Sequence, residues 1–166
     1  MRLYWKNNMS YNRRSLFGKL ALVCQQYNIE RSEVRLDGGG AALYYRLRDK
    51  TADIDVAVDG VVFDRLVEEN NLTTRLLPCL GLFPSMLMFT LGGVDFHRVE
   101  FLYEKNCRFH RQFRIQSPID LLRFKVGMGR DKDLEDIKAL ERHWKELDSF
   151  ETKRLNKLME NYHVVI

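Results

Sequence analysis

The chain has few cysteines, few prolines and no long apolar run among its 166 residues. Its three cysteines are scattered, which excludes a disulfide framework and a zinc ribbon. No window approaches about 18 consecutive apolar residues, so we expect no membrane-spanning segment and no membrane partner. The polar start, 1–10, lacks the apolar region of a secretion signal. Together these absences predict a protein of the reducing cytoplasm.

Several catalytic signatures are missing as well. The four histidines lack the spacing of metal ligands. The glycine run at 38–40 is followed neither by the Gly-Lys-Ser/Thr of a P-loop nor by the glycine spacing of a dinucleotide-binding site. There is no Gly-x-Ser-x-Gly nucleophile elbow. These gaps argue against the corresponding enzyme classes.

The composition is otherwise that of an ordinary globular protein, with 45% hydrophobic and 30% charged residues. Lysine and arginine number 27 against 23 aspartates and glutamates, which gives a net charge of +4. This mild basic excess permits a nucleotide or nucleic-acid partner but does not require one. The length suits one domain with a small helical extension.

Hydrophobic spacing predicts a mixed order of helices and strands. Helices are expected over 12–27, 40–47, 61–70, 118–127, 132–146 and 150–162. Strands are expected over 34–36, 53–58, 73–77, 86–91, 94–103 and 108–115, with a hairpin turn at Gly92-Gly93. We therefore expect an α/β (α+β) fold, in which a mixed β-sheet flanked by helices forms a core over 1–116. A C-terminal helical extension over 117–166 follows, and Ser117 caps its first helix.

The most informative segment combines a glycine turn with two aspartates. Gly38, Gly39 and Gly40 open a short helix, where free backbone N–H groups are a natural seat for phosphate. Asp53 and Asp55 follow on an apolar strand, two residues apart and therefore on one face. Two like charges held this close repel each other unless a cation lies between them, and oxygen ligands favour a divalent metal. This pattern indicates chemistry on a nucleoside triphosphate.

A third carboxylate would complete a two-metal site. Asp95 is the best candidate, because it follows the glycine hairpin turn and a neighbouring strand could bring it beside Asp53 and Asp55. Glu100 on the same run is the alternative, and periodicity does not decide between the two.

A charged helical pair follows the predicted strands. Lys125 falls on its first helix, and Arg130 and Lys132 fall at the turn between the helices. Asp133 and Asp136 share one face of the second helix. The pattern fits either a charged helix hairpin or a set of cations that reach a triphosphate as point charges.

Basic and aromatic residues alternate over 108–114. As one strand, with its phenylalanines toward the core, this run would present on a single face Arg108, His110, Gln112 and Arg114. Such a face fits either contact with an RNA backbone or the solvated side of a strand.

The segments that carry a family resemblance are Gly39-Gly40-Ala41-Ala42-Leu43, Arg48, Thr51-Ala52-Asp53-Ile54-Asp55, Val94-Asp95-Phe96, and Lys125 with Gly129-Arg130-Asp131-Lys132-Asp133 and Asp136-Ile137. In combination they resemble the nucleotidyltransferase superfamily, which has the DNA polymerase β-type fold. The nearest resemblance is to minimal nucleotidyltransferases and to the AbiEii-type toxins of bacterial toxin–antitoxin systems. It runs from about residue 34 to residue 140.

The resemblance implies a role for each part of this pattern. The residues that would hold the triphosphate are Gly38, Gly39, Gly40, Arg48, Lys125, Arg130 and Lys132. Asp53, Asp55 and Asp95 would bind two Mg²⁺ ions and carry the catalysis, with Asp95 helping to activate the acceptor hydroxyl. Many members have Gly-Ser at the turn where this chain has Gly-Gly, so a hydroxyl ligand to phosphate is missing.

The expected function is therefore that of a Mg²⁺-dependent nucleotidyltransferase. It would transfer a nucleoside monophosphate from an NTP to a hydroxyl of RNA, such as tRNA, or of a protein. The resemblance further implies a toxin of a toxin–antitoxin or phage-defence system, with a cognate antitoxin as partner. A binding or regulatory module of the same fold with weak or no catalysis is the alternative, and a phosphate-ester hydrolase is a third possibility.

Overall fold

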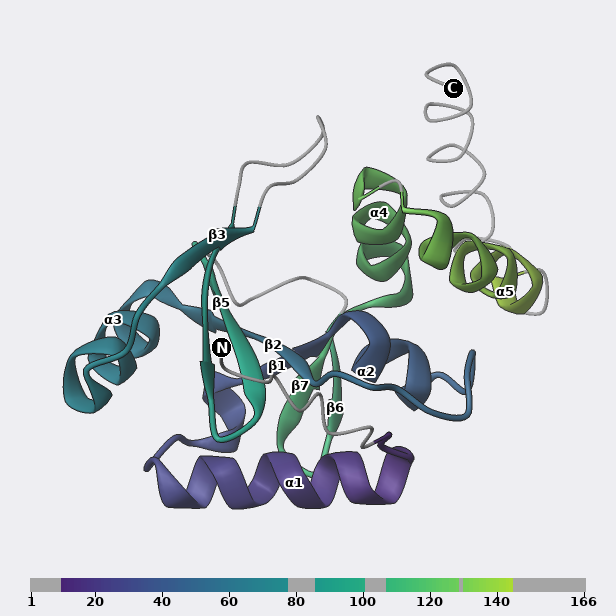
Figure 1. Cartoon of the computed structure of the whole chain (residues 1–166). Coiled ribbons are helices and arrows are strands. Elements are labelled where there is room, and N and C mark those ends of the chain that lie inside the picture. Colours follow the sequence, from purple (N-terminus) through teal and green to yellow (C-terminus); the bar gives the residue numbers. More distant parts are fainter. Residues whose placement is uncertain (1–9, 78–85, 101–106, 129, 145–166) are drawn as a thin grey trace, which may run out of the picture.

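The computed structural model describes residues 10–77, 86–100, 107–128 and 130–144 (Figure 1). The architecture is mixed α/β, with one seven-stranded mixed sheet flanked by helices, as the sequence predicts. The strands are β1 (Arg35–Asp37), β2 (Asp55–Asp59), β3 (Arg75–Leu77), β4 (Met86–Leu91), β5 (Val94–Val99), β6 (Arg108–His110) and β7 (Phe113–Ile115). The α-helices are α1 (Arg13–Gln26), α2 (Gly38–Tyr44), α3 (Gly60–Asn70), α4 (Pro118–Met128) and α5 (Leu134–Trp144), and two short 3-10 helices are η1 (Arg31–Glu33) and η2 (Asp131–Asp133).

The sheet brings together strands that lie far apart in the sequence. Its order is β3-β4-β5-β2-β1-β7-β6. β2 runs parallel to β5 and β1 runs parallel to β7, whereas the remaining neighbours are antiparallel. The centre, β5-β2-β1, therefore joins the segment after the glycine hairpin, the Asp-x-Asp segment and the segment before the glycine turn.

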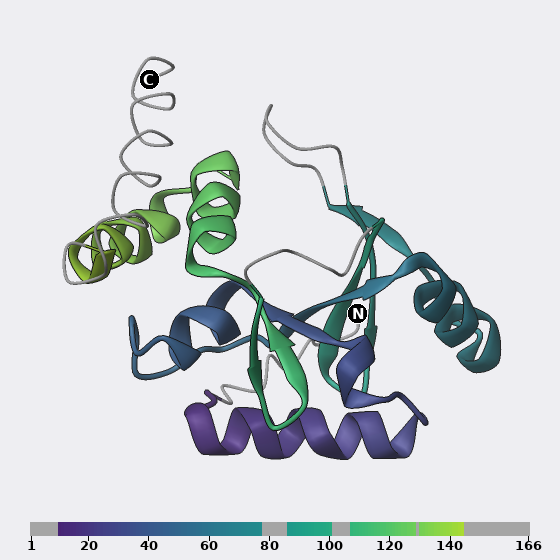
Figure 2. The same ribbon diagram turned by 180° about the vertical axis from the view of Figure 1, so that it is seen from behind.

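Helices lie around the sheet, with α1 below the strands and α4 and α5 above them in both views (Figures 1 and 2). Leu36, Val56 and Phe96 occupy neighbouring register positions on three strands and are fully buried. The ring of Phe96 stacks on Phe89 at 5.2 Å, and Phe89 meets Phe63 of α3 at 4.7 Å. This apolar face anchors the central strands. Among the described helices, none is long and apolar enough to span a membrane.

Local signals fix several element ends, among them the glycine turn and the Ser117 cap that the sequence predicts. Asn12 caps α1 through two reciprocal hydrogen bonds with Ser15, each 3.0 Å long. The β4–β5 hairpin turns at Gly92 and Gly93, which both have positive φ angles. The hydroxyl of Ser117 accepts a backbone hydrogen bond of 3.1 Å from the first turn of α4.

The prediction of one continuous strand over 108–115 is wrong. The chain turns back at Arg111 and Gln112, whose φ angles are +50° and +73°, so that β6 and β7 form a hairpin. Phe109 pairs with Arg114 and is 60% exposed, instead of facing the core. The single basic face is lost, because Phe109 and Arg114 share a face that the basic residues of β6 do not.

Other boundaries also differ from the prediction. α2 begins at Gly38, so the glycines form its first turn rather than a loop before it. β2 begins at Asp55, so Asp53 lies two residues before the strand and not on it as predicted. The end of the strand predicted over 94–103 and the helix predicted over 150–162 lie outside the described residues.

Candidate active site

Carboxylates line up across the three central strands of the sheet. Asp37 ends β1, Asp55 begins β2 and Asp95 lies near the start of β5. The register pairs Asp37 with Asp55, and Asp55 with Asp95. Paired residues point to the same face, and neighbouring strands are about 4.8 Å apart. The structure therefore brings Asp55 and Asp95 side by side, as the sequence predicts, and adds Asp37 to the row.

Asp55 is the carboxylate on which the charges of its acidic neighbours act. Its side chain is half-buried, and no hydrogen bond or ion pair from the described part of the chain reaches its carboxylate. Burial is the main cause that raises the pKa of Asp55 to about 6, against the opposing charge of His97. Three neighbouring carboxylates also raise it, namely Asp95, Asp53 and Asp37. A cation beside Asp55 would relieve this repulsion.

The other two predicted carboxylates differ in their surroundings. Asp53 is exposed, and its backbone carbonyl accepts a hydrogen bond of 3.1 Å from the hydroxyl of Thr51. Asp95 is half-buried and accepts a hydrogen bond from the hydroxyl of Thr90. A guanidinium nitrogen of Arg75, on the neighbouring β3–β4 pair, lies 3.5 Å from the same carboxylate. Asp95 is thus held in place, whereas Asp53 remains open to solvent.

Asp37 belongs to this carboxylate row but is not among the residues that the sequence predicts. It is buried and receives two hydrogen bonds from Arg35, at 2.6 and 2.7 Å. Nε2 of the buried His97 lies 3.0 Å from Oδ2 of Asp37, the same oxygen that one of these two bonds reaches. Burial alone would raise the pKa of Asp37, but the charge and hydrogen bonds of Arg35, aided by His97, lower it instead. Alternation of Arg35 and Asp37 along one strand was the available signal.

The glycine turn is adjacent to the carboxylate row. Gly38 has a φ of +56°, and a Cβ atom there would lie 3.0 Å from the Asp55 carboxylate. Its backbone N–H is already engaged, since it donates to the side chain of Gln116 at 3.1 Å. A Cβ on Gly39 would lie 2.6 Å from the Thr51 hydroxyl. The turn therefore needs glycine both for its backbone conformation and for close packing beside Asp55.

Gly40 serves packing. A Cβ at this position would lie 2.5 Å from Leu36 and 3.3 Å from Leu16, both of which belong to the buried core. α2 can therefore lie close to β1 and α1 only with glycine here. Gln116 accepts from the N–H of Gly38, but the side chain of the N-cap residue, Asp37, does not cap α2, so the N–H groups of Gly39 and Gly40 are not consumed by a cap.

The predicted triphosphate-binding cations form an ion-pair network with two aspartates. Nζ of the buried Lys125 lies 3.0 Å from Asp133 and 2.8 Å from Asp136. Arg130 binds Asp133 through two hydrogen bonds of 2.6 and 3.1 Å. The guanidinium of Arg48 donates hydrogen bonds to both carboxylate oxygens of Asp136. The structure thus brings three of the four cations together, but around carboxylates of this chain.

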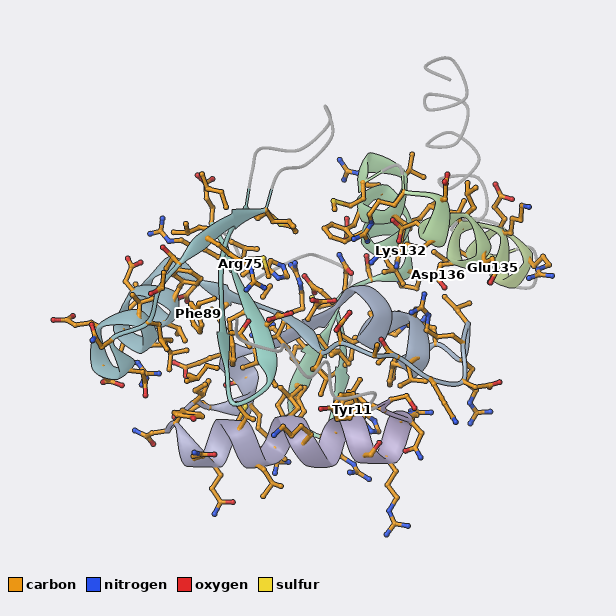
Figure 3. All side chains as sticks on the ribbon, in the orientation of Figure 1. Tyr11, Arg75, Phe89, Lys132, Glu135 and Asp136 are labelled. Carbon is orange, nitrogen blue, oxygen red and sulfur yellow. The ribbon has the colours of Figure 1, made fainter. Side chains whose placement is uncertain are left out.

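Arg48 connects this network to the glycine turn. A Cβ on Gly39 would lie 3.1 Å from a guanidinium nitrogen of Arg48, so the two residues are neighbours. Figure 3 shows Asp136 where α5 approaches α2, with Lys132 close by at the junction of α4 and α5. Lys132 is exposed and forms no ion pair with the described residues. The helical pair is therefore tied to the loop that follows the glycines.

The carboxylate row has the donor chemistry of a Mg²⁺ site without being a complete cage. Within the residues that the structure describes, no three His, Cys, Asp or Glu side chains are already gathered around one point. Mg²⁺ is usually held by one or two carboxylates, with substrate phosphates and water completing its shell. The pair of Asp55 and Asp95 fits that smaller requirement.

Comparisons with known proteins give one structural similarity. No protein-family model matches the chain, and no curated protein matches its sequence. Among solved structures, the chain is similar to the crystal structure of a "putative nucleotidyltransferase from H. pylori". The sequence identity is 16%, the TM-score is 0.48, and the match covers 92% of this chain and 80% of that chain. This similarity assigns no role to any residue.

Proposed function

We propose that the chain is a nucleotidyltransferase, which transfers a nucleoside monophosphate from a nucleoside triphosphate to a hydroxyl group. The observation that carries this proposal is the register of Asp55 against Asp95, directly beside Gly38. Like charges placed side by side cost folding free energy, and such groups concentrate at functional sites. The resemblance of the glycine turn, the Asp-x-Asp segment and the helical block to the nucleotidyltransferase superfamily supports the same function.

Mg²⁺ is the cofactor that this site fits best. We expect Asp53, Asp55 and Asp95 to supply its ligands, with two ions in the full complex. The fit rests on hard oxygen donors and on the raised pKa of Asp55, because nearby cations favour the ionised carboxylate. Bound there, Mg²⁺ would neutralise charge on the phosphates and on the attacking and leaving oxygens.

The residues of the chain would act by positioning and proton transfer rather than by covalent catalysis. Asp95 would accept the proton of the acceptor hydroxyl, since Thr90 and Arg75 fix its carboxylate in place. The backbone N–H groups of Gly39 and Gly40 would donate to the triphosphate. Of the predicted cations, Arg48, Lys125, Arg130 and Lys132, it is Arg48 that lies beside Gly39 and is best placed to add positive charge.

The acceptor and the biological role are finer parts of the proposal. We expect the hydroxyl to belong to RNA, such as tRNA, or to a protein in the cytoplasm. The mild basic excess of the chain supports an RNA acceptor. The role as a toxin with a cognate antitoxin is supported by the resemblance to AbiEii-type toxins.

A second candidate function is a nucleotide-binding or regulatory module with weak or no catalysis. The state of Lys125 favours it, since the side chain is 4% exposed and bound to two carboxylates. The N–H of Gly38 is likewise committed to Gln116. A triphosphate would have to displace these partners or bind without them. Calorimetry that shows NTP binding without turnover would favour this alternative.

A transfer assay tests the leading proposal. The protein is incubated with each α-labelled NTP, Mg²⁺ and either total RNA or a protein extract, and label in the polymer fraction is measured. We expect transfer by the wild type with at least one NTP. Asp55→Asn and Asp95→Asn should lower the rate by about a hundredfold or more, because each removes an expected metal ligand or base.

Asp64→Asn is the matched control for both substitutions. Asp64 lies on α3, its side chain is 67% exposed, and its ion pair with Arg98 is on the surface. We expect this variant to retain wild-type transfer. Absence of transfer by the wild type with every NTP, or equal transfer by Asp55→Asn and Asp64→Asn, would contradict the proposal.

A further inference from the structure

A pocket lies between the start of α1 and the β6–β7 turn, and none of the carboxylates of the row lines it. Its volume is about 490 Å³, and it is lined by Arg13, Arg14, Phe17, His110 and Arg111. The β6–β7 hairpin comes down onto α1 in both ribbon views (Figures 1 and 2). Pockets of this volume hold nucleotide-sized ligands. Three of the five lining side chains are cationic, which favours an anionic ligand.

The positive charge of this pocket is not neutralised within the described chain. Arg13, Arg14 and Arg111 form no ion pair with any described carboxylate. The first turn of α1 contains no acidic residue, so its two arginines add to the positive end of the helix dipole. Burial, and then the charges of Arg13 and Arg111, lower the pKa of His110. An anionic ligand would remove this accumulation of charge.

The guanidinium of Arg13 is oriented by an aromatic ring. Its Cζ atom lies 4.8 Å from the centre of the Tyr44 ring, and the centres of the Tyr44 and His110 rings are 5.5 Å apart, with the rings tilted at 54°. The ring of His110 in turn lies 4.6 Å from that of Phe17. Stacking on a ring leaves the in-plane N–H donors of a guanidinium available, and these donors match phosphate oxygens. The wall of the pocket is therefore preorganised for a phosphate group.

The turn that carries Arg111 is conformationally costly. Arg111 and Gln112 both have left-handed φ angles, where two-residue hairpins favour Asn-Gly or Gly-Gly. Each non-glycine residue held there costs on the order of 1 kcal/mol. Such strain concentrates at binding sites. Arg111 is exposed at the tip of the hairpin and lines the pocket. The strained turn therefore positions a cation at the pocket.

The opposite face of the same hairpin has an exposed aromatic residue. Phe109 is 60% exposed, and the guanidinium of Arg114 lies 5.0 Å from its ring. β6 is an edge strand of the sheet, so a ligand can pass around it from the pocket to Phe109. An extended chain of phosphates and bases would meet cations on one face and a stacking platform on the other.

We propose that this pocket and Phe109 together bind single-stranded nucleic acid at the β6 edge. The arginines Arg13, Arg14 and Arg111 contact the phosphate backbone, and Phe109 stacks on a base. A row of paired residues leads from Phe109 through Arg114 and Arg35 to β2. These three strand spacings amount to about 14 Å, so a bound strand can extend toward Asp55. The binding itself does not depend on the transfer reaction.

Fluorescence anisotropy with a short labelled RNA, and with DNA of the same sequence, measures this binding directly. EDTA is present and nucleotide is absent, so no catalytic complex forms. We expect Arg14→Ala/Arg111→Ala to weaken binding about tenfold. The slope of log K against log salt concentration should become less steep by about two, because two phosphate contacts are lost. Phe109→Ala should weaken binding by about tenfold through lost stacking. Circular dichroism confirms that each variant is folded.

The matched control is Arg123→Ala/Arg142→Ala, which removes two exposed arginines from α4 and α5. We expect its affinity to stay within about twofold of the wild type, since it lacks the pocket geometry. No binding by the wild type, or an equal loss in this control, would overturn the proposal. Equal competition by inorganic triphosphate at matched phosphate concentration would also overturn it, in favour of a small-anion site.

Asp55→Asn separates this inference from the transfer reaction. In this background Arg14→Ala/Arg111→Ala and Phe109→Ala should still weaken oligonucleotide binding about tenfold, because Asp55 lies outside the pocket. Binding without any transfer leaves the inference standing and removes the proposed function. If transfer to RNA occurs and does not depend on Arg14, Arg111 or Phe109, the proposed function stands and this inference is removed.

Discussion

Two neighbouring aspartates of this protein have opposite pKa shifts, although burial acts to raise the pKa of both. Asp37 and Asp55 are paired across β1 and β2. Arg35 and His97 surround the carboxylate of Asp37 and lower its pKa, whereas Asp55 has no such partner and its pKa rises to about 6. The strand pair therefore compensates one charge internally and leaves the other for a ligand. This contrast makes Asp55, and not Asp37, the candidate for a ligand-binding carboxylate.

The unpaired state of Asp55 predicts a gain in stability when its charge is removed. A folded-state pKa raised above the unfolded value near 4 means that ionisation of Asp55 opposes folding, and this cost accumulates between about pH 4 and pH 6. In EDTA at about pH 8, Asp55→Asn should raise the free energy of unfolding by about 2 kcal/mol. Below about pH 4 the two proteins should be equally stable. Urea denaturation at the two pH values measures both.

A wild type that is more stable than Asp55→Asn at high pH would contradict this expectation. Asp64→Asn serves as the control, because its exposed side chain should leave stability within about 0.5 kcal/mol at either pH.

Residue types alone predicted part of this site. The sequence predicts Asp55 together with Asp53, because two aspartates at the start of an apolar strand are unusual, and Asp95 because it follows the glycine hairpin turn. The pairing of Asp55 with Asp95 follows once the two strands are neighbours. Asp37 was not identified, since its partner His97 lies on another strand and no local pattern links them. The engagement of Lys125 by Asp133 was one of two alternatives that spacing allowed, and only packing shows its burial.

At the scale of elements, strong local signals predicted helices and one hairpin correctly. α1 has a capping residue and a regular apolar face, and the β4–β5 turn has two glycines. The β6–β7 hairpin was missed for the opposite reason. Its turn residues, Arg111 and Gln112, are not turn formers, and the alternation of the run continues through them. The chain reversal at this turn is accompanied by tertiary packing, in which the ring centres of Phe113 and Phe17 lie 6.1 Å apart.

The ion-pair network holds α4, η2 and α5 together and predicts strong sensitivity at Lys125. Lys125→Ala would leave the buried Asp133 and Asp136 without the cation between them, at a cost of about 3 kcal/mol in unfolding free energy. Lys125 and Arg130 lower the pKa of Asp133 against the effect of burial, so this stability is present above about pH 4 and is lost at lower pH. The difference in unfolding free energy between the wild type and Lys125→Ala should therefore become smaller below about pH 4. Urea titrations at several pH values measure it.

Arg123→Ala is the control for this element. Arg123 lies on the same helix, but its side chain is 47% exposed and its contact with Asp120 is 3.7 Å long. We expect a change within about 0.5 kcal/mol, as for other surface ion pairs. Equal losses in both variants would mean that the network contributes nothing beyond surface charge.

At the scale of the whole molecule, the sheet order creates the candidate site from three separate segments. β1, β2 and β5 come from distant parts of the chain, and their pairing alone places Asp37, Asp55 and Asp95 in one row. Arg48 then ties the glycine turn to the helices that follow the sheet. A ligand at the carboxylates would therefore stabilise the packing of these segments against one another. This stabilisation should raise the free energy of unfolding of the whole chain.

Binding of Mg²⁺ should raise the thermal stability of the protein at neutral pH. A ligand at about a hundred times its Kd stabilises the native state by about 2.7 kcal/mol. For a chain of this size that corresponds to a rise in Tm of several degrees, roughly 5–10 °C. Differential scanning fluorimetry with and without Mg²⁺ measures the shift, and excess EDTA should reverse it. Asp55→Asn should lose the response, because the relief of repulsion at this carboxylate is the source of the binding energy.

The response of Asp64→Asn distinguishes a site from general screening of charge. Its exposed carboxylate lies on α3, outside the row, so this variant should respond to Mg²⁺ as the wild type does. Monovalent salt at matched ionic strength should produce no comparable rise, since screening weakens all surface charges alike. An identical Mg²⁺ response in Asp55→Asn and Asp64→Asn would place any bound ion elsewhere, and the pairing of Asp55 with Asp95 would then have to be explained without a metal.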